Sequence, residues 1–383
     1  MAEGRRKIGL LFSYDENWIG GAYYIMNLIH ALGTLPDLQK PSLYILTKSR
    51  EEFNKVKESQ YPYLFFRKFD RHKSLDNYFM RLINKVGREL FGKPLIESRS
   101  IKLDILFPAV HHSYFRKIES KIYWIPDFQE HFLPNFFSDT EIINRKKSQS
   151  NIVANKYPVI FSSNNSLAHF MEIFPGADQK AMVVQFAVTH PQFNHVSFED
   201  LKTRYNIDQE YFFCANQFWA HKNHISVLEA IRIIRSEKKR NILVVFSGKE
   251  SDYRNPDFFK SIKETVFKYG IQDSVRFLGF IPREEQLQLM ANSRGIIQPS
   301  LFEGWSTVIE DGKRMNQFII ASSIDVHKEQ LLDYSNSILF EPTNSLELAD
   351  KLLKYAEIPP HKFEYGYDAR VRKFAFDFMN AIE

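Results

Sequence analysis

Residues 299–313 read Pro299-Ser300-Leu301-Phe302-Glu303-Gly304-Trp305-Ser306-Thr307-Val308-Ile309-Glu310-Asp311-Gly312-Lys313. The apolar run 295–299 predicts a buried strand that ends in Pro-Ser. The loop after it carries the acidic Glu303 and then positions 304–307, whose consecutive main-chain amides can bind an anion. Glu310 and Asp311 fall on the first turns of a helix, where carboxylates complement the helix dipole. A strand, a glycine loop and a helix in this order are typical of the ligand-binding edge of a parallel sheet.

The same alternation of strand and helix extends outward over the whole chain. In the first half, strands are predicted at 8–12, 42–46, 104–107, 121–125, 159–161 and 182–186, with an amphipathic helix at 22–32. In the second half, strands are predicted at 211–215, 241–247, 275–280, 295–299 and 318–322, with helices at 225–237, 257–269, 284–292 and 345–357. This rhythm predicts the α/β class, with parallel sheets covered by crossover helices. Because 383 residues exceed the roughly 250–300 at which one core stops growing, we expect two doubly wound domains.

The composition indicates a globular protein with a large core. Apolar residues make up 44% of the chain and charged residues 25%, which argues against disorder. The single cysteine, Cys214, excludes an intrachain disulfide and a cysteine-rich metal cluster, and it favours a reducing compartment. The first apolar run is interrupted by Ser13 and Asp15, which makes it too short for a signal peptide or a membrane span. We therefore expect a cytoplasmic protein.

The positive charge of the chain is concentrated in residues 67–99, here called the basic segment. It holds nine Lys and Arg residues against four Asp and Glu residues, in a chain whose net charge is +5. Between the cations, apolar residues recur at helical spacing: Phe79, Leu82, Ile83, Val86 and Leu90. We favour a helix that packs this stripe on the core and exposes its basic face. The alternative is an interfacial helix in peripheral contact with the anionic inner face of a membrane. Nucleic acid is not expected as a partner, because no recognition motif accompanies the charge.

Two further motifs stand between a predicted strand and a predicted helix. Adjacent glycines, Gly20 and Gly21, let main-chain amides approach a pyrophosphate at a helix N-terminus. A tight turn without a ligand is the alternative there. Lys222 would place a positive charge beside the next helix N-terminus, as a phosphate site requires. A solvated lysine followed by a helix-capping Asn223 is the alternative at this position.

In ordered combination, the motifs of the second half resemble those of the family 4 glycosyltransferases, which are retaining enzymes of the GT-B fold. The resemblance runs from about residue 211 to residue 356 and rests on five segments: Val275-Arg276-Phe277-Leu278-Gly279-Phe280-Ile281-Pro282, Pro299-Ser300-Leu301-Phe302-Glu303-Gly304, Ile320-Ala321-Ser322-Ser323, Val326-His327-Lys328-Glu329 and Ser337-Ile338-Leu339-Phe340-Glu341-Pro342. In the first half it rests only on Gly20-Gly21, the rhythm of strands and helices, and Ser162-Ser163.

This resemblance implies two Rossmann-like domains that face each other across a cleft. We predict an acceptor-side N-terminal domain at 1–190, a nucleotide-sugar-binding C-terminal domain at 191–365, and a last helix at 366–383 that crosses back onto the N-terminal domain. The polar, proline-containing segment 189–195 would connect the two domains. The apolar residues of the last helix, Val371, Phe374, Phe376 and Phe378, are expected to pack on the N-terminal domain.

The resemblance also implies a donor, a UDP- or GDP-sugar, and a set of residues that bind it. Lys222 and the amides of 304–307 would stabilise the leaving nucleoside diphosphate, and Glu303 would orient the donor sugar. The predicted nucleotide-sugar contacts are Gly20, Gly21, Gln217, Lys222, Gly304, Trp305, Ser306, Thr307, Glu310 and Asp311. No metal ion and no cofactor are implied, because a lysine and main-chain amides can replace a divalent ion.

The chain departs from the family pattern at three positions. Asp311 stands at the position of the second Glu of the pattern, with Glu310 one position early, and we expect one of the two to be free to reach the ribose. Gln217 stands at the position of an Arg, so Lys222 would neutralise the diphosphate with less help than usual. Ser306 stands at a position often held by Gly, which leaves the main-chain contacts more crowded.

In the first half, three residues are candidates for contact with the acceptor or the donor sugar. Asp127 follows the strand predicted at 121–125 and should face the cleft, so we rank it first and assign it a catalytic role. His131 lies four residues further on, and His112 belongs to the pair His111-His112. For the paired histidines, plain solvation is the alternative.

The implied activity is a hexose-type transfer to a glycan or lipid-linked acceptor, in the synthesis of a cell-surface polysaccharide. A nucleotide-sugar epimerase or a sugar phosphorylase on the same fold is one alternative, and a nucleotide-sugar-binding protein without turnover is another. A dinucleotide oxidoreductase is disfavoured, because Gly20-Gly21-Ala22 does not supply the spacing Gly-x-Gly-x-x-Gly.

Overall fold

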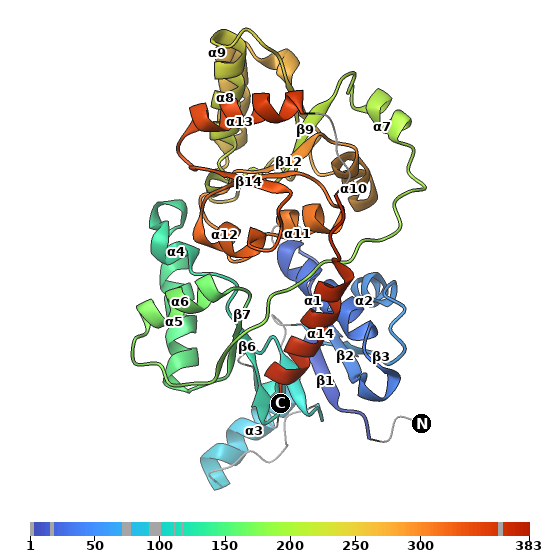
Figure 1. Ribbon diagram of the computed structural model, residues 1–383. Coiled ribbons are helices and arrows are strands. Elements are labelled where there is room, and N and C mark those ends of the chain that lie inside the picture. The colour runs from blue at the N-terminus through green and yellow to red at the C-terminus, as the bar shows by residue number, and fades with distance from the viewer. Residues whose placement is uncertain are drawn as a thin grey trace.

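The computed structural model describes residues 4–15, 19–70, 78–91, 101–110, 112–115, 118–358 and 363–383. These residues form two α/β lobes, which lie one above the other in Figure 1. Every strand pair of both lobes is parallel, and the sheets have the strand orders of Rossmann-like domains. The α/β class and the two Rossmann-like lobes predicted from the sequence are therefore confirmed.

The N-terminal lobe is built on two parallel sheets that continue into each other. The larger sheet has the order β3 (Leu64–Lys68), β2 (Ser42–Thr47), β1 (Lys7–Leu11), β4 (Ile105–Phe107), β5 (Ser120–Lys121), and the smaller has the order β6 (Tyr123–Trp124), β7 (Val159–Phe161), β8 (Ala181–Val183). Between β5 and β6, the amide of Ile122 donates to Leu106 and its carbonyl accepts from Ala109, so one residue joins the two sheets. The helices of this lobe are α1 (Ile19–Gly33), α2 (Arg50–Lys57), α3 (Tyr78–Phe91), α4 (Gln129–Phe132), α5 (Asp139–Ala154) and α6 (Asn164–Ile173).

The C-terminal lobe is built on one six-stranded parallel sheet. Its order is β11 (Val275–Phe277), β10 (Leu243–Ser247), β9 (Tyr211–Ala215), β12 (Gly295–Gln298), β13 (Ile319–Ser322), β14 (Ser337–Phe340). Its helices are α7 (Phe198–Arg204), α8 (His224–Ser236), α9 (Phe258–Tyr269), α10 (Arg283–Ala291), α11 (Thr307–Arg314), α12 (Asp325–Leu331) and α13 (Ser345–Glu357). The three central strands β9, β10 and β12 are buried along their whole length, which explains why their continuous apolar runs predict them well.

Two segments connect the lobes. Residues 184–196 run from β8 towards α7 without a helix or a strand. At the other end of the chain, α14 (Asp368–Ala381) lies along α1 in the N-terminal lobe, as Figure 1 shows. Phe374 contacts Tyr24 and Phe378 contacts Phe107, whereas Phe376 is exposed because it lies on the opposite face of α14. The exact limits of the domains stay a prediction.

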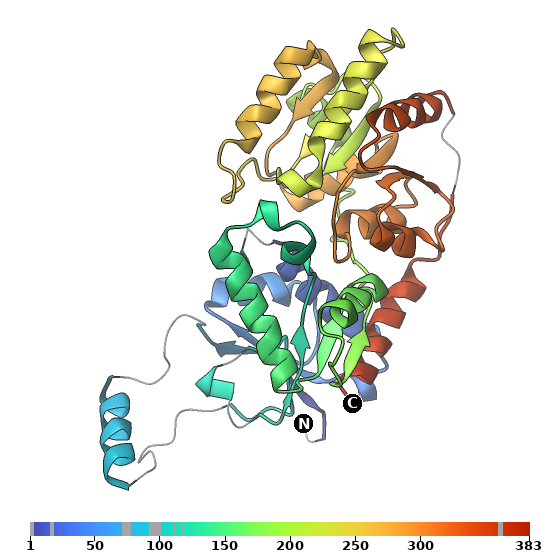
Figure 2. The same cartoon turned by 90° about the vertical axis from the view of Figure 1, so that its left-hand side faces the viewer.

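Helix α3 differs from its predicted packing. Figure 2 shows it standing apart from the sheets and the other helices, and Figure 1 places it at the edge of the N-terminal lobe. The side chains of Leu82, Val86 and Leu90 are 48%, 42% and 69% exposed, so the prediction that the stripe packs on the core is wrong for these three residues. Ile83 is half-buried, and the side chain of Phe79 lies outside the described part of the structure. The reason is that no sheet face lies beside α3 to cover the stripe within the described part of the chain. Among the helices that the structure describes, none is long and apolar enough to cross a membrane.

Candidate active site

Lys222 and Glu303 meet at the carboxyl edge of the C-terminal sheet. After β9, the chain forms a 3-10 turn, Ala220–Lys222, before α8 begins. The Nζ atom of Lys222 lies 2.5 Å from Oε1 of Glu303, in the loop after β12. Both side chains are largely buried, which strengthens the attraction between their charges. Two residues that are 81 positions apart in the sequence therefore share one site.

Asn223 fixes the turn that presents Lys222. Its backbone is in the left-handed region, with a φ of 56°, which Asn tolerates better than most residues. Its side chain makes no cap on α8, and instead its Nδ2 donates to the carbonyls of Pro299 at 3.1 Å and Pro342 at 2.9 Å. The turn is thereby joined to the loop that carries Glu303.

The carboxylate of Glu303 is bound through one of its two oxygens. Oε1 accepts hydrogen bonds from Ser300 Oγ at 2.7 Å and Gln298 Nε2 at 2.9 Å, in addition to the contact with Lys222. Gln298 is itself held by Asn216, whose Nδ2 donates to its Oε1 at 2.8 Å. Oε2 has no hydrogen-bond partner among the residues that the structure describes. The site thus fixes the orientation of Glu303 and leaves one oxygen available as an acceptor.

Gln298, Ser300 and Asn216 are functional residues that the sequence reasoning missed. Each follows or ends a strand, and each is buried, so an amide or hydroxyl there must find a partner. The signal in the sequence is a polar side chain at the end of a continuous apolar run, as in Gly295-Ile296-Ile297-Gln298. That pattern shows a buried polar group but not which residue it bonds.

Gln217 lies on the same edge of the sheet, against the end of β10. A Cβ atom at Gly248 would lie 2.1 Å from the carbonyl oxygen of Asn216 and 2.8 Å from the amide nitrogen of Gln217. Only glycine permits this close approach, and the φ of Gly248, 155°, is also one that other residues rarely adopt. The close approach holds the backbone of Gln217 in place beside the turn of Lys222.

Gly304 brings the two lobes into contact at the candidate site. A Cβ atom there would lie 1.9 Å from the carbonyl oxygen of Pro126 and 3.2 Å from the Cβ of Asp127, both in the loop after β6. No side chain fits in this space without moving one lobe away from the other. The structure therefore places Asp127 directly beside the loop that carries Glu303.

Asp127 belongs to a charged cluster of the N-terminal lobe. Its Oδ1 accepts from the amide of Gln129 at 3.2 Å and lies 3.3 Å from Nη1 of Arg145 on α5. The same Arg145 nitrogen lies 3.0 Å from Glu130, which also accepts from Gln149 at 2.6 Å. Asp127 is half-buried, whereas Glu130 is fully buried. Arg145 and Glu130 are partners of Asp127 that the sequence reasoning did not identify.

The remaining candidates of the N-terminal lobe occupy different surroundings. His131 is exposed on α4. The ring of His112 packs 5.2 Å from that of Phe69, and its Nδ1 accepts from the amide of Tyr114. His112 is therefore part of a local aromatic cluster, while His111 lies outside the described residues.

Gly20 and Gly21 form the first turn of α1, and a Cβ at Gly20 would contact no atom within 4 Å.

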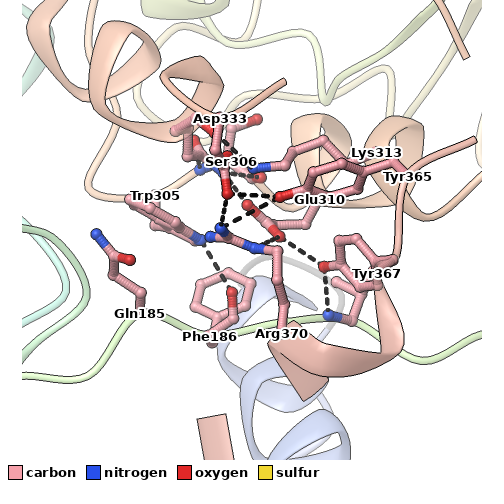
Figure 3. Close-up of polar contacts among 12 residues, drawn as sticks. Gln185, Phe186, Trp305, Ser306, Glu310, Lys313, Asp333, Tyr365, Tyr367 and Arg370 are labelled. Atoms are coloured by element: carbon pink, nitrogen blue, oxygen red, sulfur yellow. Dashed lines mark hydrogen bonds and ion pairs between the residues drawn. The ribbon is translucent and has the colours of Figure 1, made fainter. Parts of the chain in front are cut away.

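Glu310 contributes to the packing of the chain terminus onto the C-terminal lobe. It is fully buried on α11, and Figure 3 shows its side chain between those of Tyr367 and Arg370. Its oxygens accept from Gln330 Nε2 at 3.0 Å and Tyr367 Oη at 2.5 Å, and Arg370 Nε lies 3.8 Å away. Burial, followed by the charge of Glu310, raises the pKa of Tyr367 well above its ordinary value, which keeps its hydroxyl a donor. Glu310 is therefore not free to reach a ribose.

Asp311 is also held by contacts with charged or titratable side chains, one of which lies in the segment that connects the lobes. Its Oδ1 lies 2.5 Å from Nη2 of Arg283 and 2.9 Å from Nε2 of His190, which lies in the segment 184–196. Burial alone would raise the pKa of Asp311, but Arg283 and His190 hold it below its ordinary value. Because Asp311 is also fully buried, the expectation that one of the two carboxylates is free is not met in this structure.

Trp305 and Ser306 also face the protein interior. The indole Nε1 of Trp305 donates to the carbonyl of Phe186 at 3.0 Å, and the ring packs within the core of the N-terminal lobe. Figure 3 shows this contact beside the cluster of Glu310. The amide of Ser306 donates to Oε1 of Gln330 at 2.9 Å, and its carbonyl accepts from Nε2 of the same residue. Of the expected run of main-chain donors, the Ser306 amide is thus already bonded, and Thr307 begins α11.

Glu329, which the sequence reasoning did not assign, joins the lobes on the side of α6. Its carboxylate on α12 accepts from the amides of Asn164 at 2.9 Å and Asn165 at 3.0 Å, in the first turn of α6. Gln185 Nε2 donates to the same carboxylate at 2.6 Å. A carboxylate at a helix N-terminus is favourably placed, so this contact stabilises the observed arrangement of the lobes.

The comparisons with known proteins agree with this geometry. Residues 197–372 match the model of the family glycosyl transferases group 1, and this match covers the lobe that carries Lys222 and Glu303. Within residues 197–372, the chain therefore has the sequence pattern of the group 1 glycosyltransferases. A search of curated proteins found no significant match.

Solved structures resemble the chain over nearly its full length. A glycosyltransferase from Rickettsia africae is 16% identical, with a TM-score of 0.63 and coverage of 99% of this chain and 93% of that one. Anabaena HepE, solved with UDP and glucose, is 16% identical, with a TM-score of 0.61 and coverage of 98% and 95%. WaaG, a glycosyltransferase involved in lipopolysaccharide biosynthesis, is 11% identical, with a TM-score of 0.58 and coverage of 98% of each chain. At these identities the structures establish the GT-B fold.

Proposed function

We propose that this chain transfers a hexose-type sugar, with retention of configuration, from a UDP- or GDP-sugar to a glycan or lipid-linked acceptor, in the synthesis of a cell-surface polysaccharide. The family match supports the reaction class. HepE, whose structure contains UDP and glucose, supports a nucleotide hexose as the donor, and the role of WaaG in lipopolysaccharide biosynthesis supports the acceptor class. A cytoplasmic location remains part of this proposal.

The observation that carries the proposal is the pair of Lys222 and Glu303. Lys222 is the cation that would bind the diphosphate, and in the structure its charge is balanced by Glu303. A bound diphosphate would compete for Lys222, and Glu303 would then remain held by Ser300 and Gln298. Its Oε2 would accept hydrogen bonds from hydroxyls of the donor sugar. This exchange of partners would bring the diphosphate and the sugar to adjacent groups at the carboxyl edge of the C-terminal sheet.

Charge develops on the leaving diphosphate as the glycosidic bond breaks, and the site would stabilise that charge electrostatically. Lys222 provides the positive charge, and the first turns of α11 and α1 provide helix N-termini, with Gly304, Thr307, Gly20 and Gly21 at or beside them. Gln217 would add a hydrogen bond but no charge. Such a site stabilises the leaving group without a metal ion.

Asp127 would act on the acceptor side of the reaction. Its contact with Gly304 brings a half-buried carboxylate next to the sugar-binding loop, while Arg145 restrains its orientation. A carboxylate in this place can accept a hydrogen bond from an acceptor hydroxyl and increase its reactivity. His131 and His112 remain candidates for acceptor contact, although the structure does not bring His112 to the same cluster.

Calorimetric titration with UDP, GDP and ADP tests the nucleotide site. We expect one nucleotide to bind, and we expect Lys222→Ala to weaken that binding by about tenfold or more, because a charge-assisted contact to phosphate is lost. Lys260→Ala, which removes an exposed lysine of α9, is the matched control and should bind as the parent does. If no nucleotide binds, or if both variants bind like the parent, the proposed site is wrong.

A further inference from the structure

Helix α3 presents an uncovered apolar face. Leu82, Val86 and Leu90 are spaced by four residues, so they lie along one side of the helix. All three are exposed, and none of the described side chains of α3 belongs to a core cluster of either lobe. The other large apolar side chains that are exposed, such as Leu38, Met171 and Leu332, are distributed over separate elements. Scattered exposure of this kind is ordinary, but a continuous stripe indicates a binding surface.

The sequence that contains this stripe is strongly positive. The sequence of α3 contains Arg81, Lys85 and Arg88 against Glu89, and Lys85 is exposed. The basic segment 67–99 has five more cations than acidic residues, which equals the net charge of the whole chain, +5. The rest of the chain therefore has no net charge. The partner of this face should be anionic and should accept apolar side chains.

We infer that α3 is a membrane-docking helix that inserts Leu82, Val86 and Leu90 into a surface of anionic lipid. An anionic bilayer provides both requirements, since its headgroups attract lysine and arginine while its acyl boundary covers leucine and valine. A second copy of this chain fits less well, because two basic helices would repel each other. The position of α3 apart from the lobes lets it reach a flat surface, as Figure 2 shows.

This inference deepens the proposed function by naming a partner surface, and it rests on that function only for the lipid-linked acceptor. α3 belongs to the N-terminal lobe, the lobe that also carries Asp127. Docking through α3 would therefore hold the acceptor-side lobe at the surface where a lipid-linked acceptor is located. The binding of a nucleotide to the other lobe does not depend on it.

Vesicle flotation of the full chain tests the inference. The parent should float with vesicles of phosphatidylglycerol and phosphatidylcholine at low salt, and much less with phosphatidylcholine alone. The double variant Val86→Asp/Leu90→Asp should bind at least about tenfold more weakly, because two apolar contacts with lipid are lost. Lys85→Glu should weaken binding by several-fold. The matched control is Leu38→Asp, which changes a side chain that is 92% exposed outside α3 and should float like the parent.

Circular dichroism and thermal unfolding of every variant show that the lobes remain folded, and nucleotide titration keeps the two proposals separate. Flotation that depends on α3, in a protein that binds no nucleotide, would support the inference and reject the proposed function. No flotation of the parent at low salt, or equal flotation of the parent and the double variant, would overturn the inference. Self-association in sedimentation that the double variant abolishes, without any vesicle binding, would overturn it in favour of a dimer.

Discussion

Three carboxylates of one sequence motif have two different environments. Glu303 lies in the loop after β12 and keeps one oxygen without a partner among the described residues, while its other oxygen is held by Lys222, Ser300 and Gln298. Glu310 and Asp311 lie on the next helix, fully buried and bound by residues of the chain terminus and the connection between lobes. An acidic side chain is therefore a candidate ligand-binding group in the loop, whereas the two acidic side chains of the helix have a structural role.

Removal of Glu310 should produce the largest loss of stability. Glu310→Ala leaves the buried Tyr367 hydroxyl without its acceptor. It also removes one of the two acceptors of the Gln330 amide and one of the two ionic partners of Arg370. We expect the free energy of unfolding to fall by about 3–5 kcal/mol, as for other broken buried pairs. Denaturant unfolding measures this, with the exposed Glu357→Ala as control. An alanine variant as stable as the parent would contradict a structural role.

Substitution of Glu303 should have the opposite profile. Glu303→Gln keeps the shape of the side chain but removes the negative charge, so we expect the transfer rate to fall by about a hundredfold. The free energy of unfolding should fall by less than the about 3–5 kcal/mol expected for Glu310→Ala, because the amide oxygen can still accept from Ser300 and Gln298 although it no longer neutralises Lys222. Initial rates and thermal unfolding of the same preparation provide both values. Equal activity of the variant and the parent would remove Glu303 from the site.

Acid should destabilise the lobe that carries the site. Burial lowers the pKa of His224 to about 3 and that of His327 to about 4, so both are neutral in the folded chain. Below their ordinary pKa of about 6.5, the unfolded chain binds protons that the folded chain does not, and stability falls as the pH decreases towards 4. The expected slope is about 1.4 kcal/mol per pH unit for each of these two histidines, measured by denaturant unfolding at several pH values.

His224→Gln is the variant that sharpens this measurement. It removes one titrating group and should reduce the pH slope by about 1.4 kcal/mol per unit in the same window. An unchanged slope would mean that His224 does not stay neutral in the folded chain.

Trp305 should show the smallest effect. Trp305→Phe keeps an aromatic ring in the core but removes the hydrogen bond to the carbonyl of Phe186. We expect a loss of about 1 kcal/mol in the free energy of unfolding and nucleotide affinity within about twofold of the parent. A large loss of nucleotide affinity, measured by calorimetry, would instead support the donor contact predicted from the sequence.

The fold was predictable because its strands are buried and apolar. The runs at 159–161 and 211–215 match β7 and β9 residue for residue, and the runs for β10, β12 and β13 differ from the observed strands by one or two residues. β3 was missed, because Leu64–Lys68 is only partly buried and has no clear alternation. The packing of α3 was predicted wrongly, since helical spacing of apolar residues does not show whether a neighbour covers them.

The site was predictable only in part, for a physical reason. The sequence places Lys222, Glu303 and Asp127 after strands, and parallel strands bring such positions to one edge. Hydrogen-bond partners depend on the packing of segments far apart in the chain. The sequence therefore does not show that Tyr367 donates a hydrogen bond to Glu310, or that Gln330 accepts one from the amide of Ser306. The role of Gly304 as the contact with Pro126 was invisible for the same reason.

The central claim is that Glu303 binds the donor sugar while Glu310 and Asp311 hold the lobes. Calorimetric titration of Glu303→Gln with the nucleoside diphosphate that binds, and then with its hexose conjugate, tests it most directly. We predict that the variant binds the nucleotide at least as tightly as the parent does, because Lys222 no longer has to be released from Glu303, and that it loses the additional affinity that the hexose provides. An unchanged preference for the hexose conjugate, or an equal loss of affinity for both ligands, would contradict the account.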